Sequence, residues 1–79
     1  DMSEEDRSDM IRGMVVGLAA RLASEGGPPQ DWARLITALG VLNETDRAQA
    51  ILAEARTVFA ESADAMTLIE DAANRAGLQ

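Results

Sequence analysis

The chain has 79 residues, a net charge of −7, and neither cysteine nor histidine. A chain of this length suits one domain with a small core, and a composition rich in alanine and poor in aromatic residues is typical of helices. The acidic charge disfavours nucleic acid and anionic lipid as partners. The sequence contains no run of 18 apolar residues, the length needed to span a membrane. Because Ser–His, Cys–His and the usual zinc sites need His or Cys, we expect no enzyme, no metal and no cofactor.

The first helix is expected at residues 4–24. Ser3 precedes an acidic first turn, an arrangement that suits a helix N-cap and the positive end of the helix dipole. The stretch EGGPP at 25–29 ends the helix, since Gly26 or Gly27 can adopt the left-handed conformation and proline follows. The apolar residues that recur here at helical spacing, and that we expect in the core, are Met10, Ile11, Met14, Val15, Leu18 and Leu22.

Two further helices are expected at about 29–42 and 45–60. Proline suits the first turn of the former, and Asn43 or Thr45 can cap the start of the latter. The apolar faces expected to meet are Trp32, Leu35, Ile36 and Leu39 on one helix, and Ala48, Ile51, Leu52, Ala55, Val58 and Phe59 on the other.

A fourth helix is expected to begin after Ser62 and to end at Gly77, with Ala65, Leu68, Ile69, Ala72 and Ala76 on its apolar face. Short links between successive helices favour antiparallel neighbours. The sequence therefore predicts an all-α fold of about four antiparallel helices. Pairs of opposite charge three or four residues apart, which support exposed helix faces, are Asp9 with Arg12, Glu44 with Arg47, and Asp71 with Arg75.

The second and third helices together, at about 29–60, resemble one helix–turn–helix tetratricopeptide (TPR) repeat. Trp32 and Leu35 match that repeat in its first helix, and Ala48 and Ala55 match the small positions of its second. The small residues let the two helices approach, and the indole fills the wedge between them. One repeat cannot bury both faces, so the N-terminal helix and a C-terminal capping helix are expected to cover it. The departures from the repeat are Ile36, Leu39, Leu52 and Ala60.

A second resemblance covers nearly the whole chain. The stretches MIRGMVVGLAARL and DWARLITALGVLNETDRAQAILAEA, within residues 10–55, are similar to the C-terminal periplasmic part of the c-type cytochrome biogenesis family CcmI (CycH), and the tail AGLQ resembles its natural chain end. This implies that residues 1–79 form a single TPR-like domain of a longer protein. The resemblance also implies an anchor in the bacterial inner membrane outside this segment. It further implies binding of apocytochrome c, chiefly by its C-terminal helix, together with other components of the haem ligation complex.

A partner-binding groove is expected on the second helix, because the first helix of each TPR hairpin lines the concave face. Position in the repeat assigns Gln30, Ala33, Arg34, Thr37 and Val41 to this surface. The small residues among them leave room for an incoming amphipathic helix, and the arginine can pair with a carboxylate on that helix. The alternative is that these positions form an ordinary solvated face.

Other functions remain open beside this one. The thin core and the acidic surface also suit a structural helical domain that self-associates, as a homodimer or in a larger complex, to cover a leftover apolar face. Met10 and Met14 can serve as an adaptable binding surface or as haem ligands, although core packing is the expectation for both. An acyl carrier of this size and charge is disfavoured, because no serine lies in an Asp-Ser-Leu motif.

Overall fold

The computed structural model describes residues 3–78, and within them the chain is all α-helix with turns between the helices. Asp1, at the acidic start of the sequence, and Gln79, the last residue of the tail AGLQ, lie outside this range. No helix in the described part is long and apolar enough to cross a membrane. The helices are α1 (Glu4–Ser24), α2 (Pro29–Val41), α3 (Thr45–Val58) and α4 (Ala63–Arg75).

The helix bounds confirm the predicted all-α fold of four helices. The ends of α1 are those predicted, α2 ends one residue early, and α3 ends at Val58, two residues early. Both predicted serine caps are present. The Oγ of Ser3 accepts a hydrogen bond from the Asp6 N–H at 3.1 Å, and that of Ser62 accepts one from the Ala65 N–H at 3.3 Å. Each cap satisfies a backbone N–H that lacks a partner within its helix.

The turn between α2 and α3 differs from the prediction. Neither Asn43 nor Thr45 caps α3, whose N-cap is Glu44 without a side-chain hydrogen bond. Asn43 instead has a φ of 59°, and its N–H donates to the Gly40 carbonyl while the Glu44 N–H donates to the Leu39 carbonyl. This is the Schellman motif that ends a helix. Asparagine is one of the few residues that tolerate the left-handed region, which explains why it ends α2 rather than starting α3.

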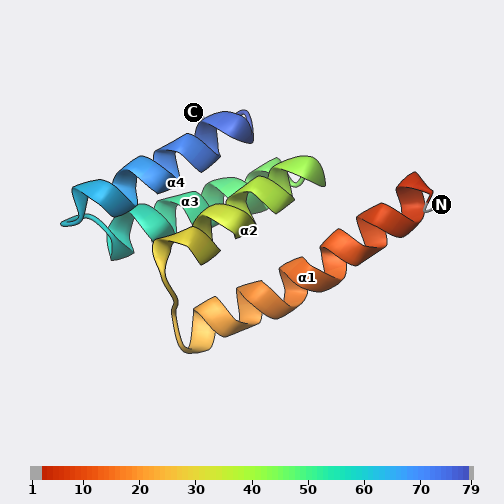
Figure 1. Cartoon of the computed structure of the whole chain (residues 1–79), viewed down its shortest axis with the longest axis horizontal. Coiled ribbons are helices and arrows are strands. Elements are labelled where there is room, and N and C mark those ends of the chain that lie inside the picture. Colours follow the sequence, from red (N-terminus) through yellow and green to blue (C-terminus); the bar gives the residue numbers. More distant parts are fainter. Residues whose placement is uncertain (1–2, 79) are drawn as a thin grey trace.

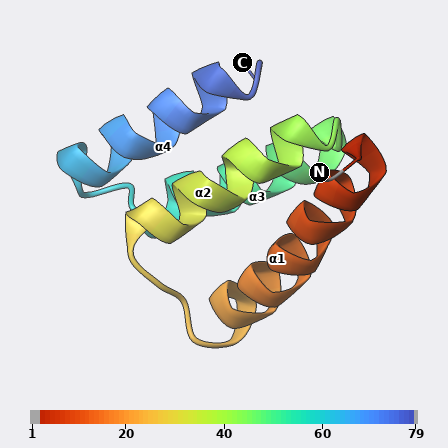
Figure 2. The same cartoon turned by 45° about the vertical axis from the view of Figure 1, so that its right-hand side comes forward.

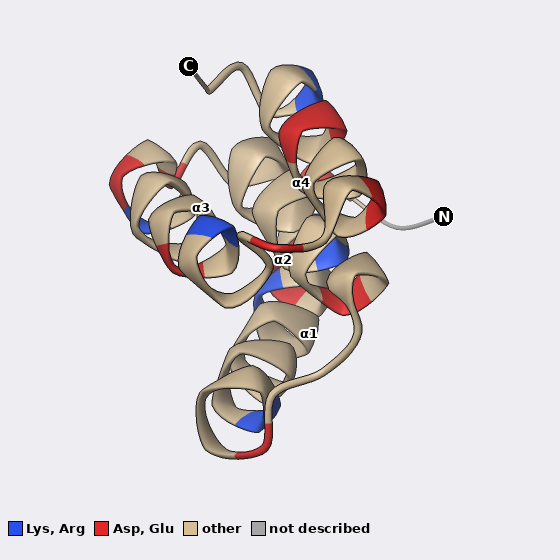
Figure 3. Cartoon of the chain, turned by 90° about the vertical axis from the view of Figure 1, so that its left-hand side faces the viewer, with Lys and Arg blue, Asp and Glu red and all other residues tan. Residues whose placement is uncertain are grey.

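Helix α2 is the central element of the fold. It contacts each of the other three helices, whereas α1 contacts α2 alone. Figure 1 shows α1 and α4 on opposite sides of the α2–α3 hairpin, with α2 and α4 running in the same direction. After a 45° turn, α1 is seen to cross α2 at a wide angle (Figure 2). The end-on view in Figure 3 places α2 in the middle of the other three helices, with charged positions on all four.

The core is centred on the buried face of α2. Leu35, Ile36 and Leu39 are at most 1% exposed, and so are Leu52 of α3 and Ile69 of α4. Burying an aliphatic side chain of this size contributes roughly 1.5–3 kcal/mol. One face of α2 thus holds most of the fold together, and residues on its other side, such as Gln30 and Arg34, are exposed.

The tryptophan packs as the sequence predicts. Trp32 is 3% exposed, and its ring meets the Phe59 ring edge-on with centroids 6.2 Å apart. Ala48 and Ala55 of α3 are fully buried, so α3 lies close to α2 at these two positions. The predicted burial of all three is confirmed, and their assignment as repeat positions stays a prediction.

The methionines of α1 correct an expectation. Val15, Leu18 and Leu22 are buried, but Met10 is 64% exposed and Met14 is 41% exposed, so the prediction that both methionines pack in the core is wrong. The reason is that α1 has one neighbouring helix, which covers only a narrow stripe of its apolar surface. Two other predicted core residues that are exposed are Val58 and Leu68.

Candidate protein-binding groove

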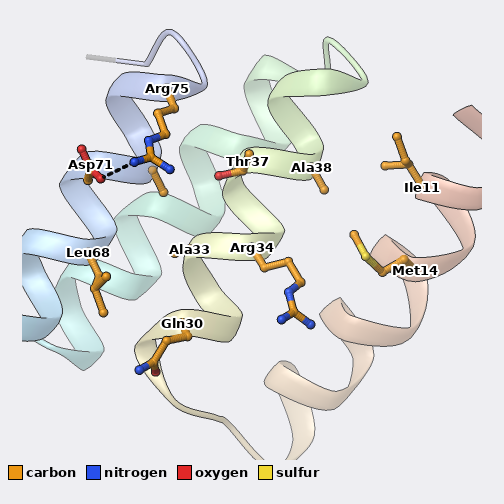
Figure 4. Close-up of a pocket in the computed structure, with 11 residues that line it drawn as sticks. Ile11, Met14, Gln30, Ala33, Arg34, Thr37, Ala38, Leu68, Asp71 and Arg75 are labelled. Atoms are coloured by element: carbon orange, nitrogen blue, oxygen red, sulfur yellow. Dashed lines mark ion pairs between the residues drawn. The ribbon is translucent and has the colours of Figure 1, made fainter.

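An open groove of about 430 Å³ runs along the outer face of α2, between α1 and α4. Figure 4 shows α2 as its floor, α1 as one wall and α4 as the other. Its lining residues are Ile11 and Met14 of α1, Gln30, Ala33, Arg34, Thr37 and Ala38 of α2, and Leu68, Asp71, Ala72 and Arg75 of α4.

Four of the five residues predicted to bind a partner lie together in this groove. Gln30, Ala33, Arg34 and Thr37 line it, since positions three, four and seven apart share one face of a helix. Val41 lies one turn further on, at the end of α2; it does not line the groove and is 61% exposed. The structure therefore brings four of these side chains to one concave surface, and their contact with a partner stays a prediction.

Three of the five α2 residues that line the groove have small side chains. Ala33 and Thr37 are half-buried and Ala38 is buried, so this part of the floor adds little side-chain bulk beneath an occupant. The α4 wall comes close because Gly40 has no side chain. A Cβ at that position would lie 2.7 Å from the Cβ of Ala76 and 3.0 Å from its Cα.

The walls carry apolar side chains, of which only Met14 was considered from the sequence as a binding surface. Ile11 and Met14 come from α1, and Leu68 comes from α4. Core packing was expected for all three, and Ile11 does pack against the core. Met14 and Leu68 are exposed instead, because helical periodicity marks an apolar face without saying whether another helix covers it. The signal that was available is that the apolar face of the first helix is wider than one neighbouring helix can bury. Methionine suits such a surface because its side chain is flexible and polarizable.

Charge in the groove is unevenly compensated. On the α4 wall, Arg75 pairs with Asp71 at 3.1 Å, as the sequence predicts, and Figure 4 marks this pair. Arg34 is exposed and takes part in none of the ion pairs found among residues 3–78. Its guanidinium extends from α2 toward α1, on the side of Met14 (Figure 4). The groove thus has one uncompensated positive charge on an acidic molecule.

Two ion pairs connect α1 to the rest of the fold. Arg21 pairs with Asp31 at the start of α2, and Arg12 lies 3.4 Å from Glu44, which follows α2. The predicted partner of Arg12 was Asp9, one turn earlier in the same helix. The predicted pair of Glu44 with Arg47 is present at 3.2 Å. Exposed pairs of this kind contribute about 0–1 kcal/mol each, so they orient α1 more than they stabilise it.

A two-point ion pair connects α3 and α4. Nε and Nη2 of Arg56 donate to the two carboxylate oxygens of Glu70 at 2.6 and 2.8 Å. These hydrogen bonds hold the pKa of Glu70 below its usual range and raise the pKa of Arg56. Sequence reasoning missed this pair because the residues lie 14 positions apart on different helices. The pair adds a polar contact between α3 and α4 to the apolar packing of α4, which buries Ala65, Ile69, Ala72 and Ala73.

Comparison with known proteins agrees with the resemblance seen in the sequence. The chain is 35% identical over 78 residues to the cytochrome c-type biogenesis protein CycH of Bradyrhizobium diazoefficiens. The aligned region covers 99% of this chain and 21% of that protein. The chain is 39% identical over 59 residues to CycH of Rhizobium meliloti, covering 75% of this chain and 16% of that protein. No family model and no solved structure matches. The chain is therefore homologous to CycH over nearly its whole length, and it spans about a fifth of the length of these relatives or less.

Proposed function

We propose that this homologue of part of CycH is a protein-binding module of cytochrome c maturation that catalyses no reaction. In this proposal the module binds the C-terminal helix of apocytochrome c and holds that protein while haem is attached. The observation that carries the proposal is the open groove along α2, which four residues chosen from the sequence line together. Homology to CycH supplies the biological setting.

The chemistry of the groove suits a helix better than a small molecule. A helix-binding groove needs apolar walls and a floor low enough to admit a second backbone. Met14 and Leu68 provide apolar surface on the two walls, and Ala33 and Thr37 provide the low floor. Polar side chains lie among these apolar ones, on the floor and on the α4 wall, so an amphipathic helix can meet both kinds of surface.

The rest of the proposal concerns where the module acts. We place it on the periplasmic side of the bacterial inner membrane, as a C-terminal TPR-like domain of a longer protein whose anchor lies outside this segment. There it acts with the other components of the haem ligation complex. The similarity to CycH supports this setting, and the acidic net charge of −7 argues against nucleic acid as a partner.

The absence of reactive side chains supports a role without catalysis. The sequence has no His and no Cys, the residues that most often act as base and nucleophile. The ionisable groups of the groove are Arg34 and the Asp71–Arg75 pair.

Calorimetry tests the proposal directly. The domain is titrated with a peptide of the C-terminal helix of a cytochrome c from its own organism, and with a scrambled peptide of the same composition. We expect binding at micromolar Kd or tighter, about −8 kcal/mol, for the native order alone. Arg34→Glu should weaken it. Equal binding of both peptides, or of neither, contradicts the proposal.

A second function, self-association, is favoured by one feature of α1. Met10 and Val16 are 64% and 65% exposed, and neither lines the groove. Exposed apolar side chains on one helix can be covered by another copy of the chain. Light scattering at high concentration tests this, and a strictly monomeric mass would exclude it.

A further inference from the structure

We infer that the groove selects its helix by a single side-chain carboxylate that pairs with Arg34. The inference rests on the proposed function, in which the occupant is the C-terminal helix of apocytochrome c. It adds a rule for which helices are accepted: one acidic residue must face the α1 side of the groove, with apolar residues one turn away on each side.

Arg34 is one of two arginines that form no ion pair within residues 3–78. The other is Arg7, which lies on α1 and does not line the groove, so Arg34 is the one of the two that faces an occupant. The other five arginines all form ion pairs with Asp or Glu. These are Arg12, Arg21, Arg47, Arg56 and Arg75.

The surroundings of Arg34 make a carboxylate partner selective. Met14, Ala33 and Ala38 line the same groove, so an occupant that turns only apolar side chains toward Arg34 would remove water from the guanidinium without replacing the lost hydrogen bonds. A cation that is covered and left unpaired is strongly unfavourable, whereas the same cation with a carboxylate is not. A helix without an acid at this position is therefore rejected by more than the loss of one contact.

The opposite wall fixes where on the helix the acid must lie. Asp71 already neutralises Arg75 at 3.1 Å, so this wall offers no free positive charge, and its carboxylate repels another carboxylate. Beside this pair, Leu68 offers apolar surface. An occupant consequently turns its acid toward Arg34 and an apolar residue toward Leu68, and residues three or four apart on its surface meet this requirement.

The net charge of the molecule limits the acid to one. A charge of −7 repels strongly acidic helices at a distance. Charge complementarity at the groove is local to Arg34, which makes a mostly neutral amphipathic helix with one correctly placed carboxylate the preferred occupant. Such selection by one charge acts on specificity more than on total affinity.

A charge-reversal experiment tests the pairing. The probe is the cytochrome c C-terminal helix peptide, amidated at its C-terminus so that only side-chain carboxylates remain. Each Asp or Glu is replaced in turn by its amide and by Arg, and every peptide is titrated against the wild type and Arg34→Glu. Arg7→Glu is the control, because it makes the same charge change at an exposed arginine that forms no ion pair within residues 3–78 and does not line the groove.

We expect one acidic position to stand apart. The peptide with an amide at this position should bind the wild-type domain about tenfold more weakly than the unmodified peptide does, a usual size for a charge-assisted contact. Its affinity for Arg34→Glu should be little lower than its affinity for the wild type. The peptide with Arg at this position should bind Arg34→Glu about tenfold more tightly than it binds the wild type. Arg7→Glu should reproduce the wild-type pattern.

The outcomes separate the two proposals. If the unmodified peptide binds but every substitution costs the same in the wild type and in Arg34→Glu, this inference is overturned and the proposed function stands. If the unmodified peptide does not bind, both fail. Circular dichroism of each variant shows whether a loss of binding comes from unfolding, and Arg34→Lys then provides a folded comparison that keeps the charge.

Discussion

Three glycines inside helices have different surroundings, and the differences are visible only at the residue scale. A Cβ on Gly13 or Gly17 of α1 would meet nothing within 4 Å, whereas one on Gly40 of α2 would come within 3.0 Å of the backbone of Ala76. Glycine lowers the stability of a helix interior relative to alanine. Gly13 and Gly17 therefore lower the stability of α1 without allowing any closer contact. Gly40, by contrast, permits α4 to approach α2.

The same substitution at these sites should have opposite effects. Gly40→Ala should lower the free energy of unfolding by about 1–3 kcal/mol, because the new methyl overpacks the contact with α4. Gly13→Ala should raise it by about 0.5–1 kcal/mol through helix propensity. Urea unfolding followed by circular dichroism measures both. A gain in stability for Gly40→Ala would mean that the end of α4 yields freely.

Two methionines one turn apart on α1 provide a matched test of the groove. Met14 lines it and Met10 does not, although both are exposed. Met14→Gln should weaken the cytochrome helix peptide by about threefold to tenfold, since a partly exposed methionine loses part of its burial energy of roughly 1.5–3 kcal/mol. Met10→Gln should leave the Kd unchanged. Equal effects of the two substitutions would argue that the peptide binds elsewhere.

At the scale of elements, the sequence predicts where helices begin and end far better than how they pack. Ser3, Ser62 and Gly77 act on the backbone within a few residues, and each behaves as predicted. Asn43 was assigned to the wrong helix, because the same residue suits the end of one helix and the start of the next. These signals are local, so short-range chemistry is enough to predict them.

The groove could be predicted only on the helix that forms its floor. Gln30, Ala33, Arg34 and Thr37 were assigned from the resemblance to a TPR repeat, and they share one face of one helix. The walls depend on where α1 and α4 dock, which involves distant contacts such as Gly40 with Ala76 and Arg56 with Glu70. No local pattern encodes those contacts, which is why Met14 and Leu68 were predicted to be core.

The Arg56–Glu70 pair between α3 and α4 should make stability depend on pH in a defined direction. The pKa of Glu70 is lower in the folded chain because Arg56 donates hydrogen bonds to its carboxylate. The stabilisation is therefore complete above the unfolded-state pKa, about 4.3, and is lost as pH falls through the lower folded-state pKa. With both side chains about two-fifths exposed, the pair is worth about 0.2–1 kcal/mol.

Glu70→Gln should remove this contribution. Its deficit in unfolding free energy relative to the wild type should be present at pH 6 and should shrink toward pH 3, as measured by urea titration at each pH. Glu54→Gln is the control, since Glu54 is an exposed glutamate of α3 that forms no ion pair within residues 3–78. A deficit that grows on acidification would contradict the assigned sign.

Helix α1 should be the least protected element of the fold. It contacts α2 alone, and its connection to α2 passes through Gly26, at a φ of 72°, and two prolines. Hydrogen exchange reports local opening, and we expect the amides of α1 to exchange faster than those of α2. Addition of the peptide should slow exchange around Met14 if α1 is a wall of the occupied site. Uniform protection of all four helices would contradict this view.

At the scale of the whole molecule, the distribution of charge sets a condition on binding. The chain carries 14 acidic residues and 7 basic ones, yet the groove has an uncompensated arginine. A carboxylate of the partner is thus repelled by most of the surface and attracted at Arg34. Such an arrangement favours correct placement of the partner over fast capture, because long-range attraction is what raises association rates.

The absence of histidine from the chain makes the pH response of binding predictable. Histidine is the side chain whose ordinary pKa places its change of charge between about pH 5 and 8, and the chain contains none. With an N-acetylated, amidated peptide that lacks histidine, the Kd should change by less than about twofold between pH 6 and pH 8. Below about pH 4 binding should weaken, because the carboxylate paired with Arg34 has a lowered pKa in the complex and binding is lost as pH falls through it. Calorimetry across this range tests both parts. A tenfold change between pH 6 and pH 8 would show that a group outside this account controls the groove, and unchanged affinity at pH 3 would show that no carboxylate contacts Arg34.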